Sequence, residues 1–142
     1  MSSPAIKLSP ERHAQVKAIG AALGGLSYAE TVGYMVNCEI AKGTIPPGIQ
    51  GVNLVAGNTG ILIGLDDQPP VPFSKDGVAD LAKTLRAFVD GDEKAQKLVN
   101  MQHNYLIERK GNGVKLTIPF AGKVTKSFPC DVARDLAELL AA

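Results

Sequence analysis

The stretch Ala5-Ile6-Lys7-Leu8-Ser9-Pro10-Glu11 sets the plan of the first part of the chain. Together with Pro4, the apolar Ile6 and Leu8 alternate with Ala5, Lys7 and Ser9, which is the period-two pattern of a short strand with one apolar face. Ser9 then offers a hydroxyl N-cap, Pro10 suits a first helical turn, and Glu11 is an acid near the positive end of a helix dipole. The stretch predicts a short strand within residues 4–9 that leads directly into a helix.

Two helices with a tight turn between them follow this strand. Gly24-Gly25 ends the first helix, because glycine accepts the left-handed conformation found at helix C-termini. Ser27 caps the second helix, and Glu30 three residues later completes a capping box. The second helix ends at Lys42-Gly43. The predicted order is strand, helix, turn, helix.

Such a segment has no obvious way to be stable as a single copy. The backbone edges of a lone strand are unpaired, and two short helices bury little apolar surface. If the strand pairs antiparallel with the strand of a second copy, four helices share one core. We therefore predict a homodimer or higher homo-oligomer, formed through a first domain at residues 1–45.

Residues 4–43 resemble the ribbon-helix-helix domain of the Arc and MetJ repressor type, in the stretch quoted above and in Gly25-Leu26-Ser27-Tyr28-Ala29-Glu30. The resemblance implies that the paired strands enter the major groove of double-stranded DNA and that the start of the second helix anchors a phosphate. It assigns base reading to Ala5, Lys7 and Ser9. It assigns phosphate binding to Gly25, Leu26 and Ser27, with Arg12 and Lys17 as flanking contacts.

The remaining chain, residues 46–142, predicts an antiparallel α+β domain. A hairpin over 52–55 and 61–65, an edge strand near 71–73 and a helix from Ser74 or Asp76 to Gly91 make one βββα unit. Residues 105–108, 114–118 and 124–128 and a helix from Pro129 make a second. The two units suggest an internal duplication of 49–91 and 103–142. Between them we expect a short helix over 92–100.

Composition excludes several classes of protein. With 142 residues, 45% hydrophobic, 20% charged and a formal net charge of +1, the chain is neither disordered nor strongly basic. No apolar stretch is long enough for a membrane span, and no secretory signal precedes the strand. Cys38 and Cys130 cannot form a disulfide framework, so we expect a cytoplasmic protein with reduced thiols.

The residues that usually carry catalysis are scarce. Two histidines do not combine with the two cysteines in any zinc-binding spacing, and no phosphate-binding loop or nucleophile elbow occurs. Cys130 near a helix start is either a reactive thiol or a space-filling side chain. We expect no enzyme, no cofactor and no metal.

Two functions remain. The first is a sequence-specific DNA-binding protein, such as a dimeric transcriptional regulator or a plasmid or phage accessory factor, whose second domain oligomerises or binds a protein or small effector. The alternative is a protein-interaction module, an inhibitor or adaptor, in which the first segment only dimerises. A candidate secondary basic patch for nucleic acid or an acidic partner consists of Arg109, Lys110, Lys115, Lys123 and Lys126.

Overall fold

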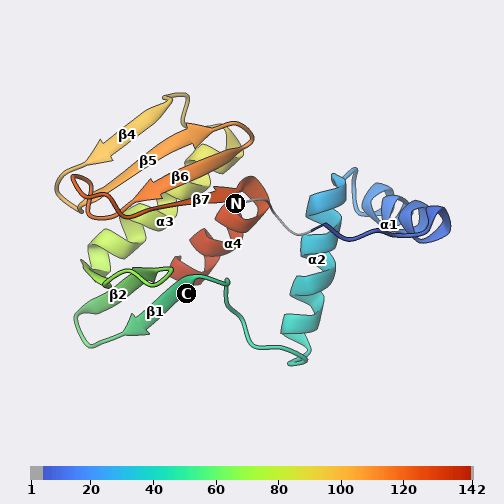
Figure 1. The fold of residues 1–142 in the computed structure, drawn as a ribbon, viewed down its shortest axis with the longest axis horizontal. Coiled ribbons are helices and arrows are strands. Elements are labelled where there is room, and N and C mark those ends of the chain that lie inside the picture. The colour runs from blue at the N-terminus through green and yellow to red at the C-terminus, as the bar shows by residue number, and fades with distance from the viewer. Residues whose placement is uncertain (1–4, 142) are drawn as a thin grey trace. The chain divides into compact units, whose positions relative to one another are not determined.

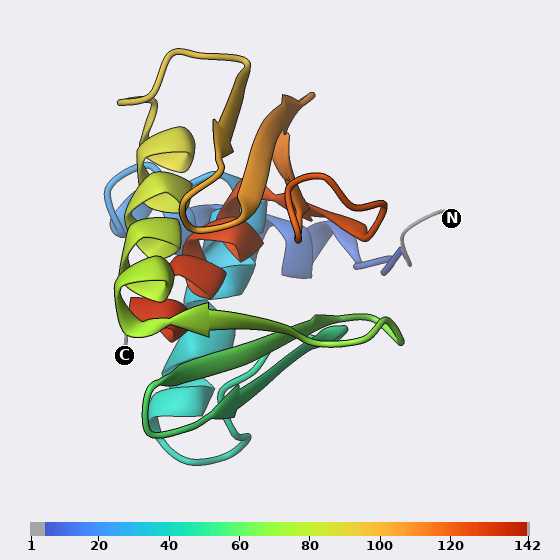
Figure 2. The same cartoon turned by 90° about the vertical axis from the view of Figure 1, so that its left-hand side faces the viewer.

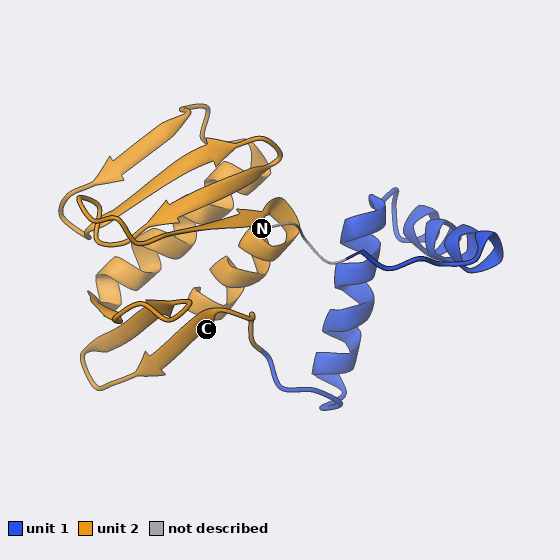
Figure 3. Ribbon diagram, viewed as in Figure 1, with its two compact units in different colours: residues 1–47 blue, residues 48–142 orange. Residues whose placement is uncertain are grey.

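The computed structural model describes residues 5–141 and divides the chain into two compact units, Met1–Pro47 and Gly48–Ala142 (Figure 3). We call them unit 1 and unit 2. The division falls in a Gly/Pro-rich stretch, Lys42-Gly43-Thr44-Ile45-Pro46-Pro47-Gly48, close to the boundary predicted at residue 45. Unit 1 is helical, and unit 2 combines two helices with two antiparallel sheets, so the chain belongs to the α+β class.

Unit 1 contains α1 (Pro10–Ala22) and α2 (Tyr28–Ala41), and their termini are capped as predicted (Figure 1). The Ser9 hydroxyl accepts a hydrogen bond from the Arg12 amide at 3.2 Å. Gly24 and Gly25 follow α1 with φ of 103° and 89°, which is the left-handed region. Ser27 and Glu30 form the reciprocal capping box at the start of α2.

Close packing of the two helices depends on a glycine. Val16 and Gly20 of α1 and Thr31 of α2 are buried, while most other side chains of unit 1 are partly or fully exposed. A Cβ at position 20 would lie 2.9 Å from the Leu26 carbonyl oxygen and closer still to Thr31 Oγ1. The turn and α2 therefore approach α1 at a distance that only glycine permits.

Residues 5–9 form no strand within a single chain and pair with none of the described strands. Pro4, at the start of the predicted strand, lies outside the described residues. Because the predicted partner is a second copy, the pairing stays a prediction. The segment does not join either sheet of unit 2.

Unit 2 begins with a three-stranded sheet in the order β1 (Val52–Ala56), β2 (Gly60–Leu65) and β3 (Val71–Ser74), followed by α3 (Lys75–Asp90). A four-stranded sheet follows, and its members are β4 (Lys97–Asn100), β5 (Tyr105–Lys110), β6 (Gly113–Thr117) and β7 (Thr125–Pro129). The chain then forms α4 (Cys130–Ala141). Both predicted hairpins and the edge position of β3 are confirmed.

One hydrophobic core holds these layers together. It includes inward side chains of both sheets and the apolar faces of α3 and α4, for example Ile63, Leu81, Leu116 and Leu136. The two helices pack against each other. α3 starts at the end of β3 in the first sheet, which is green in Figures 1 and 2. It then runs along the second sheet, which is orange.

The prediction of a short helix over 92–100 is wrong. Residues 92–96 are irregular, and 97–100 form β4, which pairs with β5. The second group of strands is therefore four-stranded rather than three-stranded. The cause lies in Arg109, whose guanidinium donates to the carbonyl oxygens of Phe88, Glu93 and Ala95. These bonds hold the segment after α3 in a path that a continuing helix could not follow.

Candidate functional site

Unit 1 leaves a broad apolar surface uncovered. Ile6 is 86% exposed and Leu8 40% exposed, and both are on the same side of a period-two segment. Large apolar side chains of both helices are also exposed: Ile19, Leu23, Val32, Tyr34 and Val36. A helix pair normally turns such residues toward a core. Among residues 5–47 only Val16, Gly20 and Thr31 are buried, so one copy of unit 1 forms little core for these side chains.

The side chains predicted to read bases are exposed. Ala5, Lys7 and Ser9 alternate with Ile6 and Leu8, and none of the three is buried. The Ser9 hydroxyl is already the acceptor that caps α1. Lys7 is therefore the one long hydrogen-bond donor among the three. On α1, Arg12 is exposed and its guanidinium donates to Gln15 at 2.9 Å, and Lys17 is exposed.

The backbone donors predicted to bind phosphate are already in use. The amides of Gly25 and Leu26 both donate to the Gly20 carbonyl at 3.0 Å. The Ser27 amide donates to the Glu30 carboxylate at 3.0 Å, and the Ser27 hydroxyl accepts from the Glu30 amide. The first-turn amides of Tyr28 and Ala29 have no described partner. The Tyr28 ring stacks on His13, with the ring centroids 5.0 Å apart.

The five basic residues near the second hairpin are not gathered on one face. Arg109 points to the inner side of the sheet, where it bonds to carbonyls and lies over the Phe88 ring. Lys126 pairs with Asp66 at 2.8 Å, and Lys115 lies 3.6 Å from Glu108 on the outer side. Lys110 and Lys123 are exposed. No single cationic surface results.

A polar cluster joins α3 to the β4–β5 turn. The fully buried Tyr105 places its hydroxyl 2.5 Å from Asp80 Oδ2 and 2.8 Å from Thr84 Oγ1. The Asn100 amide nitrogen donates to the same Asp80 oxygen at 2.8 Å. Burial, and next the hydrogen bond to Asp80, raise the pKa of Tyr105 to about 12. The cluster positions β4 against α3, and the hairpin pattern alone did not indicate it.

The cysteines and histidines of residues 5–141 are not gathered into a cluster of potential metal ligands. Among residues 5–141, no group of three or more potential metal ligands is close enough to hold an ion. Cys130 starts α4 and is half-buried, with its sulfur 2.6 Å from the Asn112 carbonyl oxygen. The thiol is thereby occupied by the turn of the second hairpin.

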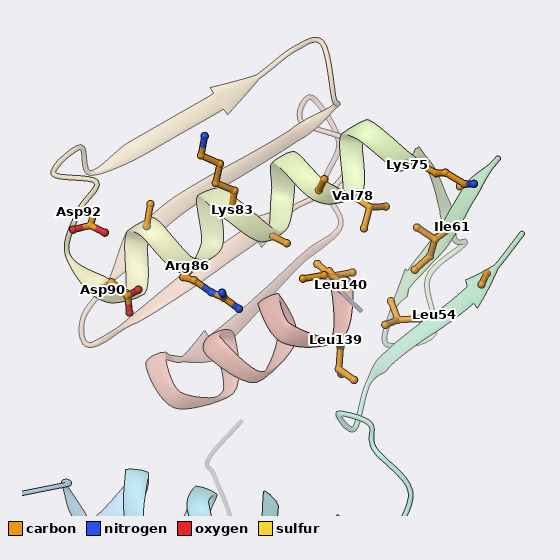
Figure 4. Close-up of a pocket in the computed structure, with 16 residues that line it drawn as sticks. Leu54, Ile61, Lys75, Val78, Lys83, Arg86, Asp90, Asp92, Leu139 and Leu140 are labelled. Carbon is orange, nitrogen blue, oxygen red and sulfur yellow. The ribbon is translucent and has the colours of Figure 1, made fainter. Parts of the chain in front are cut away.

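A groove of about 990 Å³ opens between the first sheet and the helices of unit 2. In Figure 4, Leu54 and Ile61 of the sheet face Val78 of α3 and Leu140 of α4 across this groove. Its α3 wall also carries Lys75, Lys83 and Arg86, which have no hydrogen-bond or ion-pair partner among the described residues. Asp90, at the far end, is paired with Arg134 at 3.2 Å. Sequence reasoning missed this groove, because its walls come from distant elements.

The two sheets of unit 2 share one geometry. Leu54 lies opposite Ile63 and Ile61 opposite Phe73, and in the second sheet Ile107 lies opposite Leu116 and Val114 opposite Phe128. In both sheets the strand after the hairpin turn starts with a glycine that closely approaches a phenylalanine carbonyl. They differ at one place: β5 has β4 beside it, whereas none of the strands within residues 5–141 pairs with β1 on that side.

Comparison with protein-family models, curated protein sequences and solved structures finds no significant match to this chain. No helix in the described part of the chain has the length and apolar character needed to cross a membrane.

Proposed function

We propose that residues 1–47 form a dimeric ribbon-helix-helix module that binds double-stranded DNA. The observation that carries this proposal is the uncovered apolar surface of unit 1. Burial of a large apolar side chain stabilises a protein by about 1.5–3 kcal/mol, so Ile6, Leu8 and the exposed faces of α1 and α2 favour a second copy as cover.

The same pairing explains which side chains would meet DNA. If Ile6 and Leu8 face the shared core, the alternation turns Ala5, Lys7 and Ser9 away from it. Two copies of Lys7 then lie on a two-stranded ribbon, whose width suits the major groove. Lysine can donate to the O6 and N7 atoms of guanine. Arg12 and Lys17 lie on the following helix, within the same module.

Phosphate binding at the start of α2 is revised by the hydrogen bonds of the turn. Gly25, Leu26 and the Ser27 amide are already bonded within the chain. In the proposed complex the donors are the Tyr28 and Ala29 amides and the hydrogen of the Ser27 hydroxyl. Glu30 lies beside them, so phosphate binding there includes a local repulsion that the resemblance does not anticipate.

For unit 2 we propose an origin by duplication and a role in oligomerisation or in binding an effector. The equal registers of the two hairpins and the glycine at the same place in each support the duplication. Residues 91–100 are then an addition to the second half. Unit 2 holds the groove between its first sheet, α3 and α4, which is where an effector or partner would act.

Selection from a random duplex library at about 0.15 M salt tests DNA binding directly. Lys7→Ala should weaken binding to the selected sequence by about 1–3 kcal/mol and relax its sequence preference. Lys94→Ala removes the same charge from an exposed site in unit 2 and should leave binding unchanged. A library that yields no enriched sequence, or equal losses for the two variants, would contradict the proposal.

The second candidate is a protein-interaction module in which unit 1 only dimerises. It is favoured by the satisfied amides at Gly25–Ser27 and by the low charge of residues 1–48, which carry four basic and three acidic side chains. DNA binders usually neutralise several phosphates. Light scattering separates the candidates, because a dimer that stays unchanged in mass with excess duplex DNA favours the second.

A further inference from the structure

The outer edge of β1 is an unprotected strand edge. Two backbone hydrogen bonds show which residues of β1 bond to β2. The Gly57 amide donates to the Gly60 carbonyl at 2.8 Å, and the Asp66 amide donates to the Gly51 carbonyl at 2.7 Å. Since bonded residues alternate in an antiparallel pair, Asn53 and Val55 face β2. Leu54 and Ala56 therefore direct their N–H and C=O groups away from β2, where no described strand pairs with them.

The other sheet edges carry residues that discourage strand addition. β3 contains Pro72, β4 contains Lys97, and β7 contains Lys126 and Pro129. Prolines and lysines on edge strands prevent pairing with foreign strands. The sequence of β1, Val52-Asn53-Leu54-Val55-Ala56, contains neither and has no charge. This edge therefore has the composition of a strand that is normally covered.

The second sheet shows what covers the equivalent edge. In that sheet Ile107 of β5 lies opposite Leu116 and so corresponds to Leu54 of β1. The strand β4 lies antiparallel beside β5. The Arg109 amide donates to the Gln96 carbonyl at 2.8 Å, and the side chain of Arg109 and residues 93–95 fill the space beside the end of α3. Beside β1, the corresponding position is taken by the groove that Leu54 and Ala56 line.

From this we propose that the edge of β1 and the adjoining groove bind an extended, acidic peptide segment of a partner protein, which adds to the sheet as β4 does beside β5. The backbone of the peptide pairs with Leu54 and Ala56. An apolar side chain enters the groove between the first sheet, Val78 and Leu140, and a carboxylate approaches the cations of α3. The proposal does not depend on DNA binding by unit 1.

The charge of the groove decides between a peptide and a second copy of this chain. Lys75, Lys83 and Arg86 line it without described partners. Of its two acids, Asp90 is engaged by Arg134, and Asp92 is exposed at the end of the groove near Asp90, so the lining keeps an excess of one positive charge. In Figure 4 Arg86 extends from α3 toward α4. The β1 strand of a second copy brings no acid to these cations. An acidic peptide satisfies both the open backbone edge and the positive wall.

The test selects peptides of about seven residues, a typical strand length, from a random displayed library with the full-length protein as bait. Fluorescein-labelled copies of the selected peptides are then titrated by fluorescence polarisation. We expect sequences that alternate apolar and polar residues and contain an acid. On binding, amide hydrogen exchange should slow at Leu54 and Ala56, while Asn53 and Val55 are slow already in the free protein.

Variants at the edge supply the decisive comparison. Ala56→Pro removes an edge-facing N–H and should weaken peptide binding at least about tenfold, which corresponds to the loss of one hydrogen bond. Ala56→Val keeps the N–H and should bind like the wild type. Arg86→Glu should also weaken binding, whereas Lys94→Glu, an exposed site outside the groove, should not.

Several results would overturn the proposal. One is a selected peptide that binds Ala56→Pro as tightly as Ala56→Val, and another is unchanged exchange at Leu54 and Ala56. Light scattering that shows Ala56→Pro dissociating an oligomer would identify a second copy as the occupant. If Ala56→Pro does not fold, a peptide N-methylated on its edge-facing amides must lose binding to the wild-type protein, and retained binding would exclude strand addition.

Discussion

At the residue scale, we expect the hydroxyl of Tyr105 to make unit 2 less stable as the pH rises through the alkaline range. The folded protein holds its pKa at about 12, above the ordinary value of 10.0, because burial and Asp80 disfavour the phenolate. A group whose pKa is raised by folding contributes its full stabilisation of the folded state below its unfolded pKa, here pH 10. That contribution is lost as the pH rises toward 12.

We expect the free energy of unfolding of unit 2 to fall by about 1–2 kcal/mol between pH 10 and 12 because of this residue. Tyr105→Phe should be less stable at pH 8 by about 1 kcal/mol, since the bond to Asp80 is lost, but its stability should fall less steeply above pH 10. Urea unfolding at several pH values measures both effects. Parallel pH profiles for the two proteins would exclude this role.

Arg109 carries a second residue-scale prediction. Its guanidinium donates to three carbonyl oxygens and covers the Phe88 ring, with 4.9 Å between Cζ and the ring centroid. Arg109→Met keeps the apolar contact but leaves the carbonyls without this donor, so unit 2 should lose about 2–3 kcal/mol.

Lys110→Met, at the neighbouring exposed position, is the matched control and should change stability by less than about 0.5 kcal/mol. Chemical denaturation followed by circular dichroism compares the two variants. Equal stabilities would mean that residues 93–95 hold their path without Arg109.

At the scale of elements, the crossing of α1 and α2 depends on Gly20. Alanine there adds a Cβ that meets Thr31 Oγ1 and the Leu26 carbonyl, and the turn must shift to admit it. We expect Gly20→Ala to destabilise unit 1 by about 1–3 kcal/mol, although alanine is otherwise the better helix former. Thermal unfolding at one fixed protein concentration measures the change.

Gly48→Ala is the control for that variant, because no atom lies within 4 Å of the added Cβ and the backbone there is not left-handed. Its melting temperature should stay close to that of the wild type. A Gly20→Ala protein that is as stable as Gly48→Ala would show that α1 and α2 have room to separate.

The elements also show where local patterns suffice. The caps of α1 and α2 and both hairpins depend on residues three or four positions apart or directly opposite each other, and all were predicted. β4 was missed because Arg109 and Asp80 decide it from across the chain. The alternation of the inward Leu98 and the exposed Val99 was the available signal.

At the scale of the whole molecule, the two compact units should unfold as separate transitions. If unit 1 dimerises through its apolar surface, its transition rises in temperature with protein concentration, and that of unit 2 does not. Ile6→Asp places a charge on that surface and should yield a monomer by light scattering at about 10 µM. This concentration is well above the dissociation constant expected of a stable dimer, so the wild type should be dimeric there.

Met101→Asp is a fair comparison, because Met101 is an apolar residue of unit 2 that is 72% exposed. It should leave the oligomeric state and both transitions unchanged. A wild-type chain that is monomeric at this concentration would remove the dimer and, with it, the DNA-binding ribbon.

The sequence by itself determined the helix caps, the two hairpins and the α+β class, because each follows from neighbouring residues or from apolar periodicity. The cover that the sequence predicts for the first segment stays a prediction. Only the tertiary structure decided that 97–100 form a strand, that Arg109 is bonded within the fold and that β1 has an open edge beside a groove. These features depend on side chains far apart in the chain. Their meeting is a property of the packed core, which no local pattern contains.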